Sequence, residues 1–209
     1  MTRGSFHSEQ IVLSPEFFRF FTSGQYDLEL KQLEEYYSNS GNEKLWDGPF
    51  EQPVRGVVSS GFGIDRTYNG QERRRHLGTD FDVPVGTPVN AVARGRVVFA
   101  QPLVVRGSAI VLDHGVGVHS TYYHLSRIDV KPGEVVNRGQ PIGLSGRNRH
   151  GDGAASPLRD PDRRHRRRAD GVVSHPLPLA ASAGANQFEQ SDAWYAILGT
   201  PPTRMLEDR

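Results

Sequence analysis

The stretch Pro88-Val-Asn-Ala-Val-Ala-Arg-Gly-Arg-Val-Val-Phe99 decides the fold class, because it is rich in valine and is broken by a glycine. Similar Val-rich runs recur on both sides of it, at residues 54–58, 108–113, 118–124 and 135–142. β-Branched residues favour pleated strands, and the glycines and prolines between the runs favour turns. We therefore predict a mostly β domain over residues 50–147, folded as a small antiparallel β sandwich or barrel.

The sequence before this domain is typical of a helix. Apolar residues lie near helical spacing over residues 28–37, at Leu28, Leu30, Leu33 and Tyr36 or Tyr37. A stripe of this kind forms the buried face of an amphipathic helix. Residues 1–49 are therefore predicted to be a lead-in segment with one short helix, which packs on the β domain or binds a partner.

The sequence after the domain has a different composition. Arg, Ala, Asp, Pro and Gly dominate residues 151–184, without the alternation of a strand or the period of a helix. We predict that residues 148–209 form an atypical, disordered tail. The basic run at residues 163–168 has the charge to bind nucleic acid, but no aromatic residues are interleaved with it. A solvated segment without a nucleic-acid partner is the favoured interpretation.

Composition excludes several classes of protein. The chain has 209 residues, which suits one domain with flanking segments, and a formal net charge of +1, which gives no global attraction to polyanions. It has no cysteine, so thiolate zinc sites, disulfides and cysteine nucleophiles are excluded. No apolar run approaches the ~20 residues of a membrane helix, and the N-terminus has no signal-peptide pattern.

Two short motifs carry side chains that suit a metal site. His76-Leu-Gly-Thr-Asp80 supplies an imidazole and a carboxylate four residues apart, and Tyr123-His124-Leu125 supplies a second imidazole. A catalytic zinc ion takes three protein ligands and keeps one position open for water. Two ligands make half of such a site. On spacing alone, a loop histidine and a solvated aspartate are the favoured interpretation of the first motif.

The order of motifs over residues 46–147 resembles the lysostaphin-type (LytM) zinc metalloendopeptidases. The resemblance is carried by Pro53-Val-Arg-Gly-Val-Val-Ser-Ser-Gly-Phe-Gly63, His76-Leu-Gly-Thr-Asp-Phe-Asp-Val-Pro-Val-Gly-Thr-Pro-Val89, 93–98, Val111-Leu-Asp-His-Gly115, Tyr123-His-Leu-Ser126, Val130-Lys-Pro-Gly133 and Gly139-Gln-Pro-Ile-Gly143. It implies a β fold of the duplicated hybrid motif type. It also implies zinc held by His76 and Asp80, and a catalytic His124 that orients or deprotonates the attacking water.

The resemblance further implies a substrate and a location. Such proteins cleave peptide crosslinks of bacterial peptidoglycan, so the implied partner is a peptidoglycan peptide in the cell envelope, either periplasmic or extracellular. Since this chain has no signal peptide at its N-terminus, a truncated N-terminus is the favoured interpretation.

One family motif is missing. The family closes its site with His-x-His, whose second histidine is the third zinc ligand and whose first is a catalytic imidazole. The tail histidines here, His150, His165 and His175, are all isolated. We therefore expect the chain as written to be inactive or impaired.

A shifted reading frame would explain this gap. If the codon boundary moves one nucleotide forward near Asn148, codons that encode residues 155–159 permit the reading His-Leu-His-Phe-Glu. We therefore hypothesise that residues after about 148 are an out-of-frame translation.

Two other functions compete with the peptidase hypothesis. A degenerate, noncatalytic family member would bind peptidoglycan or an envelope partner, although such a scaffold has no need of His76 and Asp80. Lipoyl or biotinyl carrier barrels share the turn pattern, but no lysine occupies the hairpin tip that carriers modify. Four further residues are given minor roles: His114 is predicted to be a structural turn residue, His119 a surface residue, Asp82 a solvated residue or a support for a ligand, and Tyr68 a solvated loop residue.

Overall fold

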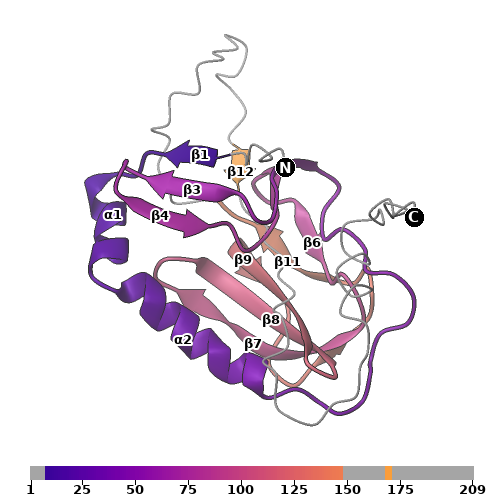
Figure 1. Ribbon diagram of the computed structural model, residues 1–209. Coiled ribbons are helices and arrows are strands. Elements are labelled where there is room, and N and C mark those ends of the chain that lie inside the picture. Colours follow the sequence, from indigo (N-terminus) through magenta and orange to yellow (C-terminus); the bar gives the residue numbers. More distant parts are fainter. Residues whose placement is uncertain (1–7, 148–167, 171–209) are drawn as a thin grey trace, which may run out of the picture.

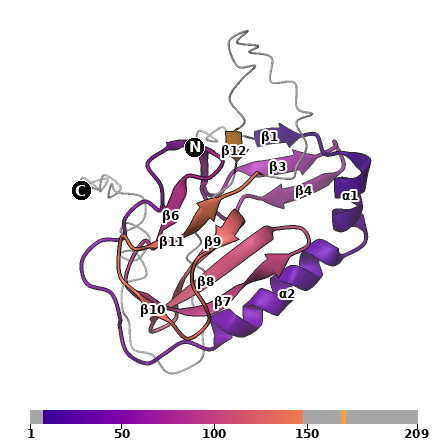
Figure 2. The same ribbon diagram turned by 180° about the vertical axis from the view of Figure 1, so that it is seen from behind.

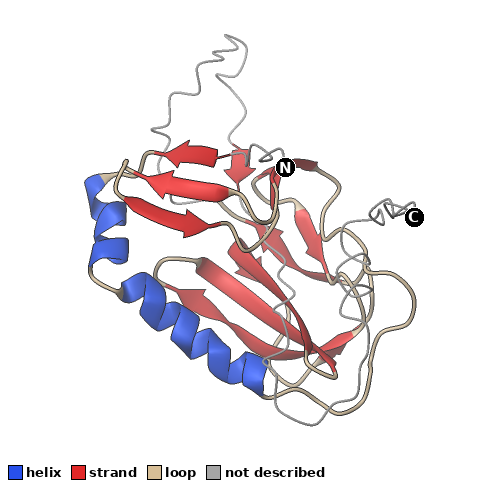
Figure 3. Cartoon of the chain, in the orientation of Figure 1, coloured by secondary structure: helices blue, strands red, loops and turns tan. Residues whose placement is uncertain are grey.

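The structure is a computed structural model that describes residues 8–147 and the backbone of residues 168–170. Within these residues the chain is mostly antiparallel β structure, which confirms the predicted fold class (Figure 1, Figure 3). The elements in chain order are β1 (Ser8–Ile11), α1 (Pro15–Thr22), α2 (Gln25–Ser38), β2 (Val57–Ser60), β3 (Asp65–Tyr68), β4 (Glu72–Arg75), β5 (Asp80–Pro84), β6 (Pro88–Asn90), β7 (Gly95–Leu103), β8 (Gly107–Gly115), β9 (Val118–Ile128), β10 (Val135–Val136), β11 (Pro141–Ser145) and β12 (Arg168–Asp170).

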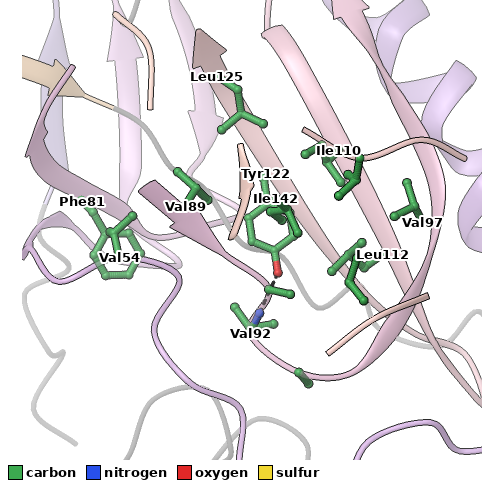
Figure 4. Packing of buried hydrophobic residues seen from close by; sticks show 14 of the residues in the cluster. Val54, Phe81, Val89, Val92, Val97, Ile110, Leu112, Tyr122, Leu125 and Ile142 are labelled. Carbon is green, nitrogen blue, oxygen red and sulfur yellow. Dashed lines mark hydrogen bonds between the residues drawn. The ribbon is translucent and has the colours of Figure 1, made fainter. Parts of the chain in front are cut away.

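A six-stranded antiparallel sheet forms the centre of the fold, in the order β10-β7-β8-β9-β11-β6. The strand β5 lies in a second sheet between β2 and β12. Side chains from the first sheet and from β5 meet in the main core, drawn in Figure 4. The core is largely aliphatic, with Tyr122 at its centre, and the Tyr122 hydroxyl accepts a hydrogen bond from Val92 N at 3.0 Å. This bond satisfies a polar group that burial would otherwise leave unpaired.

Helix α2 covers the other face of the six-stranded sheet, as both views show (Figure 1, Figure 2). Leu33 of α2 is fully buried in a second cluster with Phe99 and Val111. An irregularity in β7, where the register shifts between Val97 and Phe99, places Val97 in the main core and Phe99 under the helix. The central strands are therefore buried on both faces.

Burial on both faces overturns the prediction that His119 is a surface residue. Its exposed fraction is 2%, and its ring contacts Tyr37 of α2 edge-on with the centroids 5.6 Å apart. The prediction rested on the absence of a partner motif near His119, and the helix that covers this face cannot be read from the strand itself.

A third sheet, β1-β3-β4, joins the N-terminal segment to the domain. β1 pairs in parallel with β3, and β3 pairs antiparallel with β4 in a hairpin. Helix α1 begins after Ser14, whose hydroxyl caps the helix by accepting from Phe17 N. Phe21 of α1 stacks between Tyr26 and Tyr68, which fixes α1 against β3.

The N-terminal segment differs from the predicted single helix in two ways. It contains two helices, separated by Gly24 at a φ of 77°, a conformation that glycine adopts readily. The buried face of α2 also differs from the leucine pattern: Leu28 is 62% exposed, whereas Glu29 is buried. Among the described residues, no helix is long and apolar enough to cross a membrane.

His114 generates a prediction about acid stability. Its ring is buried, Nδ1 donates to Arg94 O at 2.8 Å, and Nε2 lies 2.8 Å from the Ser120 hydroxyl, as expected of a structural residue. Burial lowers the pKa of His114 from 6.5 to about 4. The unfolded chain therefore binds the extra proton between these pH values, so stability falls as the pH drops from 6.5 to 4, by roughly 3 kcal/mol from this residue.

Urea unfolding at pH 7.0, 5.5 and 4.0 measures this effect. A His114→Gln variant keeps a side chain that can donate and accept but cannot titrate in this range. We expect the variant to be less stable at pH 7 and to lose less stability on acidification than the parent chain. Parallel pH profiles for the two proteins would contradict the assignment.

Candidate metal centre

The residues of the predicted His-x-x-x-Asp motif lie together between β4 and β5. His76 follows β4, and Asp80 is the first residue of β5. Two backbone hydrogen bonds hold His76 against the preceding loop, from Gly63 N to His76 O and from His76 N to Ile64 O, each at 2.7 Å. The backbone that carries the imidazole is thus fixed on both sides of its Cα atom.

The two ring nitrogens of His76 have different roles. Nδ1 lies 2.8 Å from Gly61 O, and since a carbonyl oxygen only accepts, Nδ1 carries the proton. The Ser60 hydroxyl lies 3.4 Å from the same nitrogen. Nε2 is buried and has no hydrogen-bond partner among the described residues. A buried lone pair without a donor is costly, unless a further group binds there.

Asp80 completes a pair with this nitrogen. Its Oδ1 lies 3.3 Å from His76 Nε2, and its Oδ2 accepts from Arg66 Nη2 at 2.5 Å. Arg66 in turn donates through Nε to Glu9 Oε2 at 2.9 Å. The neutral imidazole nitrogen and the carboxylate oxygen converge, which is the donor set that zinc takes in proteins without cysteine ligands.

Electrostatics keep the Asp80 carboxylate ionised. Burial alone would raise the pKa of Asp80, but contact with His76, which stabilises the carboxylate when Nε2 also carries a proton, and with the Arg66 guanidinium outweighs burial and lowers the pKa to about 2. Asp80 is therefore available as an anionic ligand throughout the neutral range. The contribution of Arg66 and Glu9 was not predicted, since neither lies in the motif and β1 and β3 carry no Val-rich signal.

His124 lies on β9, at a β-bulge. Ser108 pairs with Leu125 and Ile110 pairs with Tyr122, so Tyr123 and His124 together oppose a single residue of β8. His124 has a φ of 54°, which is uncommon for a residue with a side chain. Its N–H donates to Arg106 O at 2.9 Å, and its carbonyl accepts from Gly146 N at 2.8 Å.

A short path of hydrogen bonds connects His124 to the strand that carries Asp80. Gly146, bonded to His124 O, follows Ser145 at the end of β11. The Ser145 hydroxyl donates to Pro84 O at the end of β5, at 2.8 Å. β9 and β5 belong to different sheets, and this path ties them together. Placement of His124 beside the metal remains a prediction from the resemblance.

Two other residues considered in the sequence analysis, Tyr68 and Asp82, do not contribute ligands to the His76–Asp80 pair. Tyr68 is buried and stacks on Phe21 with the ring centroids 4.8 Å apart, so the prediction of a solvated loop tyrosine was wrong. Asp82 is half-buried on β5, two residues after Asp80, and pairs in register with Val57. Neither observation adds a ligand to the pair.

The third ligand is not found in the part of the chain that the structure describes. Over residues 8–147, no group of three or more histidine, aspartate or glutamate side chains is arranged to hold a metal ion. The tail histidines His150, His165 and His175, and the residues of the frameshift hypothesis, lie outside the described residues. The described residues thus fit two of the three ligands of a zinc site.

Arg66 generates a prediction about the stability of the site. An Arg66→Met change would leave the Asp80 carboxylate buried without its cation, so we expect a loss of about 3 kcal/mol in the free energy of unfolding. Arg75 provides a control on the same hairpin, because its pair with Asp65 is exposed. Arg75→Met should change stability by less than ~0.5 kcal/mol. Urea unfolding at pH 7 compares the two variants, and equal losses would refute the role given to Arg66.

Known proteins resemble this chain in sequence and structure. Residues 74–157 match the profile of peptidase family M23. The chain is 39% identical over 120 residues to the peptidoglycan DD-endopeptidase ShyA of Vibrio cholerae, a match that covers 56% of this chain and 28% of ShyA. It is 31% identical over 160 residues to ShyB of the same organism, covering 73% of this chain and 36% of ShyB.

A solved structure agrees with these matches. A crystal structure of a family M23 peptidase from Pseudomonas aeruginosa superposes with a TM-score of 0.54 at 28% sequence identity, covering 73% of this chain and 55% of that one. The chain spans about a third of the length of the two Vibrio relatives. The family profile continues to residue 157, beyond the last residue of the described β domain.

Proposed function

Because the chain carries a domain of peptidase family M23, the lysostaphin-type family, we propose that it derives from a zinc-dependent endopeptidase that cleaves peptide crosslinks of bacterial peptidoglycan. The names of the two Vibrio relatives state this class of substrate for those proteins. By the same analogy, the place of action is the cell envelope. We further propose that the chain with this C-terminal sequence is inactive or impaired, because the sequence contains no His-x-His motif to supply the third ligand.

One observation supports the metal part of the proposal most directly. His76 Nε2 is buried without a hydrogen-bond partner, 3.3 Å from Asp80 Oδ1, while Nδ1 is occupied by Gly61 O. A metal-ligating histidine usually donates its other ring N–H to a carbonyl or carboxylate, which fixes the tautomer and the orientation of the ring. In His76 the Nδ1–H donates to Gly61 O, which fixes the ring. Asp80 is oriented by a hydrogen bond that its Oδ2 accepts from Arg66 Nη2.

Each residue has a defined task in the proposed reaction. His76 and Asp80 would hold zinc, which would supply polarisation of the peptide carbonyl and activation of water. Arg66 pairs with the Asp80 carboxylate and fixes its direction. His124 accepts or donates the proton that moves during attack on the carbonyl and departure of the amine. The missing His-x-His would supply the third ligand and a second imidazole.

The impairment follows from the same division of tasks. Loss of one ligand out of three weakens metal binding and also changes where water is held, so affinity and rate fall together. Loss of the paired imidazole removes a further proton carrier. The retained pair explains why the chain would still bind zinc, though more weakly than a complete site.

Zinc content of the purified chain tests the metal part. We expect up to one zinc per chain, lost in His76→Ala and retained in His124→Ala, because only the former removes a ligand. Peptidoglycan fragments released by the chain should stay close to background. A chain without zinc would contradict this part of the proposal, and would favour the alternative of a noncatalytic module that binds peptidoglycan.

The reading frame is tested separately, on the coding DNA. Codons for residues 155–159 that cannot spell His-Leu-His-Phe-Glu in the shifted frame would refute the frameshift hypothesis. If they can, a chain with the frame restored near Asn148 should release peptides from peptidoglycan in a chelator-sensitive reaction. A restored chain that binds zinc and releases nothing would refute the proposed activity.

A further inference from the structure

A buried carboxylate on helix α2 lies outside the site described above. The exposed fraction of Glu29 is 3%. Its Oε1 accepts from Val105 N at 2.8 Å, and its Oε2 accepts from Arg106 N at 3.3 Å and from Arg106 Nη1 at 3.1 Å. One side chain of the N-terminal segment therefore binds two successive backbone amides and a guanidinium in the connection between β7 and β8.

Arg106 is fixed by further contacts. Its Nη1 also lies 3.3 Å from Tyr26 O, and its guanidinium carbon lies 4.1 Å from the centre of the Tyr26 ring. The ring of Tyr123 lies on the β9 side, 5.6 Å away. A guanidinium over an aromatic ring gains cation–π attraction, which is stronger when the cation is removed from water. The ion pair is thus enclosed between α2 and β9.

The same residue supports the unusual backbone of His124. The carbonyl of Arg106 accepts the His124 N–H, at the point where β9 carries its bulge and His124 has a φ of 54°. A positive φ at a residue with a side chain persists only where the surroundings hold it. On the other side, Gly146 N donates to His124 O, and a Cβ atom at Gly146 would lie 2.6 Å from that oxygen.

We propose that Glu29 is a positioning residue for His124. It fixes the backbone at Val105 and Arg106, and Arg106 O then holds the His124 amide in the conformation that aims the imidazole. The value of this position for catalysis rests on the proposed function, which gives His124 its proton-transfer task. The effect of Glu29 on the His124 backbone does not depend on a bound metal.

A simpler role for Glu29 would be attachment of α2 to the sheet. Leu33 already attaches the helix to the sheet, because it is fully buried in a cluster with Phe99. Apolar packing holds the helix without a charge, and an ion pair in an apolar interior gains little net stability over such packing. The contact of Glu29 with the successive amides of Val105 and Arg106 adds a feature that apolar packing does not provide. It fixes the direction of the Arg106 carbonyl group.

Hydrogen exchange and NMR of the full chain without added zinc distinguish the two roles. In Glu29→Ala, exchange of the His124 amide relative to the Leu112 amide in the core should accelerate roughly tenfold, because the opening is local. The amide–α coupling of His124, which reports φ, should move toward the value of an extended residue. Glu29→Gln keeps one acceptor oxygen and should show a smaller change in the same direction.

Leu33→Ala is the matched control. It loosens α2 over Phe99 but leaves the Glu29 contacts in place, so the His124 coupling should stay unchanged. The inference is overturned if both Glu29 variants leave the exchange ratio and the coupling of His124 unchanged, or if Leu33→Ala reproduces their effect. Failure of the zinc and peptidoglycan experiments above would refute the proposed function without affecting this result.

Discussion

The hydrogen bond between His76 Nδ1 and Gly61 O determines what the candidate site can do. It places the proton on one ring nitrogen and leaves the lone pair of Nε2 buried, beside an aspartate that is paired with the Arg66 guanidinium. Without that bond, Nε2 would be free to carry the proton and donate to Asp80, which gives a closed pair with no capacity for metal. The choice of tautomer thus separates a metal ligand from an ordinary buried histidine.

The sequence predicted the β domain well because valine runs and Gly-Pro turns are local signals. Most of the six-stranded sheet lies in predicted runs, although the run at residues 88–99 divides into β6 and β7. The β1-β3-β4 sheet was missed, since its strands are polar and short and β1 pairs with a strand distant in sequence. For α2, the predicted apolar stripe is buried at Leu33 but not at Leu28. The neighbouring Glu29 is buried through its bonds to the β7–β8 connection.

The site was predictable only as far as its motif reaches. His76 and Asp80 are four residues apart, and the chain needs one loop and the start of a strand to bring them together. The supporting residues are distant: Arg66 lies on another sheet, and Glu9 reaches it through a parallel strand pair. The bulge at His124 depends on the register between β8 and β9, which valine patterns do not encode. Each feature that the sequence did not predict depends on a contact between segments that only the tertiary fold brings together.

The N-terminal segment contributes to both halves of the candidate site in the same way. Glu9 holds Arg66, which holds the metal-ligand candidate Asp80, and Glu29 holds Arg106, which holds the backbone of His124. In each case a glutamate from residues 8–38 fixes an arginine of the β domain, and the arginine acts on the site. A lead-in that only covered apolar surface would need no such pairs, since apolar contacts suffice for packing. The segment therefore supports the candidate site as well as the fold. A β domain cut at residue 50 would keep every predicted site residue yet lose the contacts that hold Asp80 and the backbone of His124.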